Sequence, residues 1–159
     1  PRPESYREDY HNAMLSGNQE FYFSNIITAT ESGWDFSSRW FDDPMDIKTI
    51  QIVNIVPVDL NSIMFQNEIC LMEFHRLLGN EKKAKFYENA ARRRQRAINT
   101  ILWDKELNMW GDYNLKTRKL NSNYLYITDL SPLWSGVEPP VDADIILNRY
   151  KSLLFDHMS

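Results

Sequence analysis

The chain has 159 residues, enough for one domain with a sizeable hydrophobic core. Hydrophobic residues make up 43% of it and aromatic residues 13%, as in globular proteins, and no basic stripe accompanies the formal net charge of −4. The composition therefore argues against a nucleic-acid-binding protein, and the single cysteine, Cys70, excludes an internal disulfide. We expect Cys70 to be a buried, unreactive residue on a helix face.

Two helices are predicted at the start of the chain. The first covers residues 3–16, because Pro3 suits a first helical turn, Glu4 begins an acidic N-terminal half and Gly17 ends the pattern. The second covers residues 19–30. Its predicted apolar stripe consists of Phe23, Ile26, Ile27 and Thr30.

The segment ESGWDFSSRW, residues 31–40, suits neither a helix nor a strand. Gly33 permits a sharp turn, and the nearby aromatic residues would desolvate Asp35, which favours the protonated form of its carboxyl group. Such an acid can donate a proton to a leaving group, and flat aromatic faces suit a sugar ring. The alternative is a structural ion pair between Asp35 and Arg39, one helical turn apart, with the tryptophans in the core. On composition alone, this alternative is the more common arrangement.

Residues 41–57 are the least helical part of the sequence. Asp42-Asp43-Pro44 is typical of a turn, and the β-branched residues between 50 and 56 predict a short strand or an extended segment. The acidic residues at 42, 43 and 46 lack the spacing of a calcium loop, which favours a solvated loop. The three histidines, His11, His75 and His157, also lack the spacing of zinc ligands, so we expect no metal site.

The strongest helical pattern predicts a hairpin of two long helices, residues 60–78 and 80–102, joined at Gly79-Asn80. Asp59 is the predicted N-terminal cap. The expected apolar stripe of the first helix is Leu60, Ile63, Met64, Asn67, Cys70, Leu71, Phe74, Leu77 and Leu78. The expected inward residues of the second are Ala84, Tyr87, Ala91, Ile98 and Ile101. The basic run at residues 92–96 is interpreted as a solvated helix face.

Loops and short strands are predicted for residues 103–120, and mostly irregular structure for residues 121–140, with one short helix at 131–134. Asp112 lies among aromatic residues and is a second candidate acid, although turn chemistry explains it equally well. Asp142 should cap a last helix. Its expected buried side is Ile145, Ile146, Arg149, Tyr150, Leu153 and Leu154. The predicted fold class is therefore mainly α, with helix pairs and long loops.

Three segments carry a family resemblance: PRPESYREDY at residues 1–10, ESGWDFSSRW at 31–40 and PVDLN at 57–61. Together they closely resemble trehalases, glycoside hydrolases that split α,α-trehalose into two glucoses. The resemblance implies that Asp35 is the catalytic acid. It also implies substrate contacts for Arg2, Pro3, Glu4 and Gly33, to which Trp34 adds an aromatic wall. Without the resemblance, Arg2 and Glu4 would be interpreted as an ion pair at a helix end.

The resemblance further implies an (α/α)6 toroid of the six-hairpin glycosidase type, of which residues 1–159 would be a partial catalytic domain. The expected reaction is hydrolysis with inversion, which needs an acid and an opposing base but no metal or organic cofactor. The segment that carries the base in trehalases does not occur in the sequence, so we expect an internal fragment that is inactive alone. Trehalose is the expected partner, with no nucleic acid and no metal.

Two alternatives to a trehalase stay open. One is another toroid α-glucosidase, and the other is a non-catalytic helical module that binds a sugar or a partner protein. The resemblance suggests an extracellular or membrane-anchored protein, but a fragment leaves membrane association undetermined. For the chain alone, we expect the two long helices to cover each other, while 21–27 and 145–154 expose apolar surface.

Overall fold

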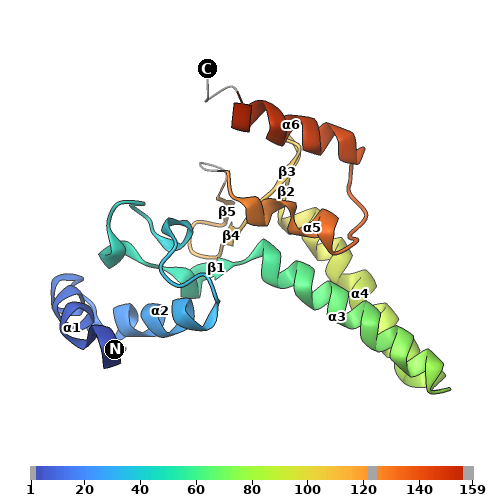
Figure 1. Cartoon of the computed structure of the whole chain (residues 1–159), viewed down its shortest axis with the longest axis horizontal. Helices are drawn as coiled ribbons and strands as arrows, with labels where there is room; N and C mark the ends of the chain where they lie inside the picture. Colours follow the sequence, from blue (N-terminus) through green and yellow to red (C-terminus); the bar gives the residue numbers. More distant parts are fainter. Residues whose placement is uncertain (1–2, 122–124, 156–159) are drawn as a thin grey trace. The chain divides into compact units, whose positions relative to one another are not determined.

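The computed structural model describes residues 3–121 and 125–155 and is mainly helical, which confirms the predicted fold class (Figure 1). The chain divides into two compact units, unit 1 (Pro1–Ile55) and unit 2 (Val56–Ser159). Among the described residues, no helix combines the length and the apolar character needed to cross a membrane.

Unit 1 begins with a helix pair. A 3-10 turn at Pro3–Ser5 leads into α1 (Tyr6–Leu15), and α2 (Gln19–Glu31) follows after a short link. Asn18 caps α2, because its side chain accepts a hydrogen bond from the backbone N–H of Phe21 at 3.1 Å. The second predicted helix is confirmed to within one residue at each end. The first is also found, but α1 begins three residues later than predicted, because residues 3–5 form the 3-10 turn.

The buried face of α2 differs from the predicted stripe. Ile26 is fully buried as expected, but Ile27 is 54% exposed and Thr30 is also exposed. Asn25 takes a place in the core because its side chain accepts a hydrogen bond from the Val53 N–H at 3.1 Å. This hydrogen bond turns the face of α2 that carries Asn25 toward the segment around Val53. The core of unit 1 consists of Ala13, Tyr22, Ile26, Ala29, Trp40, Ile50 and Ile52.

The rest of unit 1 is folded as turns. Short 3-10 turns occupy Ile47–Thr49 and Ile52–Asn54, and the strand β1 (Ile55–Val56) follows them. The predicted short strand is therefore found at Ile55–Val56, while Ile52–Asn54 forms a turn instead of an extended segment. The Asn54 N–H bonds the Gln51 carbonyl at 2.8 Å, which closes the backbone into a turn despite its β-branched residues.

Unit 2 contains the predicted hairpin, in which α3 (Val58–Leu77) and α4 (Glu81–Ile101) run antiparallel, side by side (Figure 1). The connection depends on Gly79, which adopts φ +69°, a conformation that favours glycine. Asn80 then starts α4, with its side chain accepting a hydrogen bond from the Lys83 N–H at 3.1 Å.

The helix faces in the seam of this hairpin differ from those predicted. On α4 the small or apolar residues Ala84, Ala91 and Ile98 are buried as expected, but Ile101 is 49% exposed. On α3 the predicted stripe is largely exposed. Its exposed members include Leu60, Ile63, Met64, Leu71, Phe74, Leu77 and Leu78. The residues of α3 that are buried are Val58, Asp59, Ser62, Phe65 and Glu68, while Cys70 is only half-buried. The open apolar face expected for the isolated chain therefore also includes α3.

An ion pair explains why a less apolar face of α3 meets α4. Arg94 donates two hydrogen bonds to the Glu68 carboxylate, from Nε to Oε2 at 2.9 Å and from Nη2 to Oε1 at 2.8 Å. Its third nitrogen, Nη1, donates to the Asn61 side chain at 3.1 Å. Such a bidentate pair combines strength with fixed geometry. Arg92 is exposed, as expected for a solvated basic face, whereas Arg94 belongs to the helix seam.

The start of α3 is stabilised by a residue far away in the sequence. The predicted cap, Asp59, lies inside the helix, and Pro57 occupies the capping position. The backbone N–H of Val58 instead donates to the Asp112 carboxylate at 2.9 Å. Asp112 is 2% exposed, and this buried capping bond gives it a structural role.

The short strands predicted after α4 are found in unit 2, where they form two small hairpins. In the first, β2 (Trp103–Asp104) pairs antiparallel with β3 (Met109–Trp110); in the second, β4 (Tyr113–Asn114) pairs with β5 (Lys119–Leu120). The short helix α5 (Ser131–Trp134) and the final α6 (Ala143–Phe155) are also confirmed. Asp142 caps α6 by accepting a hydrogen bond from the Asp144 N–H at 3.0 Å.

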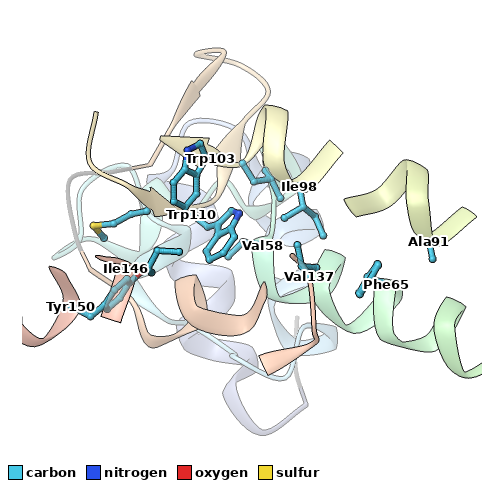
Figure 2. Packing of buried hydrophobic residues seen from close by; sticks show 11 residues of the cluster. Val58, Phe65, Ala91, Ile98, Trp103, Trp110, Val137, Ile146 and Tyr150 are labelled. Atoms are coloured by element: carbon cyan, nitrogen blue, oxygen red, sulfur yellow. The ribbon is translucent and has the colours of Figure 1, made fainter. Parts of the chain in front are cut away.

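The core of unit 2 gathers around two tryptophans (Figure 2). The rings of Trp103 and Trp110 meet edge to face with centroids 4.8 Å apart. From α6, Ile146 and Tyr150 are buried as predicted, whereas Ile145 and Arg149 are exposed and Leu154 lies outside the described side chains. Burial raises the pKa of Tyr150, and the nearby Asp129 carboxylate adds to the rise.

Candidate active site

The candidate active site is the loop of residues 32–38, which follows α2 in unit 1. Ser32 holds its first half: its hydroxyl donates to the Ala29 carbonyl at 2.6 Å and accepts from the Trp34 N–H at 3.1 Å. Ser37 holds its second half, because its N–H donates to the Trp34 carbonyl at 3.2 Å and its hydroxyl accepts from the Arg39 N–H at 3.3 Å. The serines of the sequence motif therefore fix the backbone on both sides of Asp35.

Two residues of the loop have left-handed backbone conformations. Gly33 has φ +77°, which glycine adopts without cost. Asp35 has φ +43°, which is uncommon for a residue with a Cβ atom, although aspartate and asparagine tolerate it better than most. A backbone held in such a conformation is a known feature of functional sites.

The Asp35 side chain is exposed, and the expectation that aromatic residues desolvate it is wrong for the described chain. Trp34 is 45% exposed, and Phe36 is half-buried. Trp40 is fully buried because it belongs to the core of unit 1 rather than to the loop. The backbone turn at the loop separates the aromatic residues, which the sequence places side by side.

The alternative ion pair between Asp35 and Arg39 is also wrong. Within residues 3–121 and 125–155, no hydrogen bond or ion pair involves the Asp35 side chain. Arg39 is 1% exposed, and its guanidinium carbon lies 4.4 Å from the centroid of the Trp40 ring. Of this alternative, only the placement of Trp40 in the core is therefore correct. The carboxyl group of Asp35 is accessible to a ligand.

The remaining predicted site residues are near the N-terminus. Pro3 and Glu4 lie in the 3-10 turn before α1, and the Glu4 side chain is exposed. Arg2 lies outside the described residues. Glu4, Gly33, Trp34 and Asp35 thus belong to one unit, and each is open to solvent.

Among residues 3–121 and 125–155, no group of three or more His, Cys, Asp or Glu residues could hold a metal ion. Asp42, Asp43 and Asp46 form a turn-rich loop, as predicted: Asp46 pairs with Lys48 at 3.0 Å, and Asp43 accepts a hydrogen bond from the Met45 N–H at 3.0 Å.

The two glycines with φ +77°, Gly33 and Gly17, provide a matched test of the loop. A Cβ atom at either position would meet no atom within 4 Å, so alanine introduces only backbone strain. We expect Gly33→Ala and Gly17→Ala each to lower the free energy of unfolding by about 1–2 kcal/mol, measured by urea denaturation. A much larger loss at Gly33 than at Gly17 would contradict this expectation, because it would mean that a side chain at Gly33 also meets atoms of the loop.

Sequence similarity to known proteins extends along the chain. The family model described as Trehalase matches residues 1–155. The chain is 39% identical to the trehalase of Dictyostelium discoideum, with 100% of this chain and 27% of that protein covered. It is 39% identical to the trehalase of Homo sapiens (86% and 24% covered) and 41% identical to a periplasmic trehalase of Escherichia coli (84% and 24% covered). The chain therefore spans about a quarter of the length of these relatives.

Proposed function

Because this chain belongs to the trehalase family, we propose that residues 1–159 are part of the catalytic domain of an enzyme that hydrolyses α,α-trehalose to two glucose molecules. The observation that carries the proposal is the family match over residues 1–155, which includes the complete 31–40 segment. In this proposal the exposed α3 face and the helix hairpin are parts of an (α/α)6 toroid.

Asp35 is the proposed general acid. In an inverting glycosidase, one carboxylic acid protonates the departing glycosidic oxygen, while a second carboxylate activates a water molecule on the opposite face of the sugar. The exposure of Asp35 leaves its carboxyl group accessible to the leaving oxygen of a bound sugar. The desolvation that favours the protonated form is then supplied by the bound sugar and by the rest of the toroid. The absence of a partner for its carboxyl group among the described residues also supports this role.

Substrate contacts are proposed for Arg2, Pro3, Glu4, Gly33 and Trp34. Trp34 lies next to Asp35 and exposes 45% of its surface, enough apolar area to contact a sugar face. The exposed carboxylate of Glu4 can accept hydrogen bonds from sugar hydroxyls. Hydrolysis needs only water as the second reactant, so the proposal includes no metal or organic cofactor.

A location outside the cytoplasm is part of the proposal. It is supported by relatives from Citrobacter koseri and Escherichia coli whose names describe them as periplasmic trehalases.

Time-resolved proton NMR of trehalose hydrolysis, with the catalytic domain that contains this chain, tests the proposed function. Inversion at one anomeric centre predicts equal initial amounts of α-glucose and β-glucose, before the sugars equilibrate. Trehalose should also be cleaved faster than maltose and other α-glucosides. Initial formation of α-glucose alone would indicate a retaining enzyme, a preference for maltose would indicate another α-glucosidase, and no hydrolysis would favour a binding module.

A further inference from the structure

Arg39 is the one buried positive charge among the described residues of unit 1, with a relative exposure of 1%. Removing a cation from water costs several kcal/mol unless its surroundings compensate. Its guanidinium carbon lies 4.4 Å from the centroid of the Trp40 ring, close enough for a cation–π interaction. Trp40 itself is 0% exposed, so the stack lies within the core and has a fixed position.

The backbone around this stack connects the active-site loop to the core. Ser37 accepts the Arg39 N–H through its hydroxyl at 3.3 Å and the Trp40 N–H through its carbonyl at 3.0 Å. On the other side, the Trp40 carbonyl accepts the Gln51 N–H at 2.8 Å. Residues 37–40 are therefore fastened to the core at the end of the loop that carries Asp35.

Asp35 needs such an anchor, because its own φ of +43° is sparsely populated and persists only where the surrounding structure imposes it. Among the described residues, no hydrogen bond or ion pair of its side chain holds it in place. The direction of its carboxyl group thus depends on the backbone at both ends of the loop. At the C-terminal end of the loop, Arg39 and Trp40 are both buried in unit 1.

We propose that Arg39 is a positioning residue for Asp35: by stacking on Trp40, it holds the loop so that the carboxyl group of Asp35 meets the glycosidic oxygen. The inference rests on the proposed role of Asp35 as general acid. It predicts an effect on the chemical step, since a misplaced proton donor slows turnover without removing a contact to the sugar.

Arg39→Lys tests the inference, because lysine keeps the charge but lacks the planar group that stacks on the indole. In the catalytic domain that contains this chain, we expect kcat for trehalose to fall about 10–100-fold and KM to change less than about threefold. The matched control is Arg7→Lys, which makes the same replacement at an exposed position of α1 and should leave both constants unchanged.

A double-mutant cycle separates positioning from a merely structural role. In the Asp35→Asn background, Arg39→Lys should change the residual turnover by less than about twofold, because there is no acid left to position. The same fall in both backgrounds, or a rise in KM at constant kcat, would overturn the inference. If Asp35→Asn alone leaves turnover unchanged, the proposed acid role fails, whatever Arg39 does.

A second variant covers the case in which Arg39→Lys does not fold. Trp40→Phe keeps an aromatic face under the guanidinium but makes it smaller, so kcat should fall in the same direction by a smaller factor. This fall should also disappear in the Asp35→Asn background. An unchanged kcat in a folded Trp40→Phe variant, confirmed by circular dichroism, would contradict the role of the stack.

Discussion

In the catalytic domain that contains this chain, replacement of Asp35 by asparagine is expected to lower the turnover of trehalose by roughly 10²–10⁴-fold, the usual contribution of a positioned general acid. An amide has nearly the same shape as the carboxyl group but does not release a proton to the leaving oxygen. Asparagine also tolerates the left-handed backbone that Asp35 adopts at φ +43°. The loop should therefore keep its conformation, and KM for trehalose should change little.

Asp43→Asn is the matched control for this experiment. Asp43 is another exposed aspartate on a turn of unit 1, and its side chain accepts a hydrogen bond from the Met45 N–H. Because asparagine can accept the same bond, turnover should stay within about twofold of the unchanged protein. If Asp35→Asn also remained within about threefold, the acid role would be excluded.

Trp110→Ala is expected to cause the largest loss of stability, about 3–5 kcal/mol, as for other buried tryptophans. Trp110 is 2% exposed, packs against Trp103 in the core of unit 2 and donates from its indole nitrogen to the Asn99 side chain at 3.1 Å (Figure 2). Alanine leaves a cavity there and removes the donor for Asn99. Urea denaturation, with circular dichroism as the signal, measures the effect.

Trp134→Ala is the control for the stability measurement, because it removes the same side chain from a position that is 65% exposed. We expect it to cost less than about 1 kcal/mol, as for surface substitutions in general. A similar cost at both positions would contradict the assignment of Trp110 to the core of unit 2.

The helices and most of their ends could be predicted from the sequence, because the signals that set them act over a few residues. Asn18, Asn80 and Asp142 each accept a backbone hydrogen bond from a residue two or three positions further on. Gly17 and Gly79 end their helices through a left-handed conformation that other residues adopt at a cost.

The faces of the helices could not be predicted, because distant residues decide them. Glu68 is buried against α4 because it pairs with Arg94, which lies 26 positions further along the sequence. The N–H of Val58 is capped by Asp112, which lies 54 positions further along. No pattern within a few residues of Glu68 or Val58 indicates that these distant residues are their partners. The hydrophobic periodicity of α3 correctly identified a helix, but its most apolar face is largely exposed in the structure.

At the candidate site, the loop after α2 agrees with the sequence prediction. The environment of Asp35 does not, because the aromatic residues of one segment separate when the backbone turns. Trp40 joins the core, whereas Trp34 remains at the surface. The sequence analysis also did not predict the buried stack of Arg39 on Trp40, because it depends on the same turn of the backbone. An arginine next to a tryptophan is only a weak signal for a cation–π pair.

The most direct test of Asp35 as general acid compares two substrates of the Asp35→Asn variant, trehalose and α-glucosyl fluoride. Fluoride leaves without protonation, so the fluoride substrate does not require a proton donor. We predict that kcat/KM falls about 10²–10⁴-fold for trehalose and less than about tenfold for the fluoride. An equal fall for both substrates would contradict the acid role, and so would undiminished hydrolysis of trehalose.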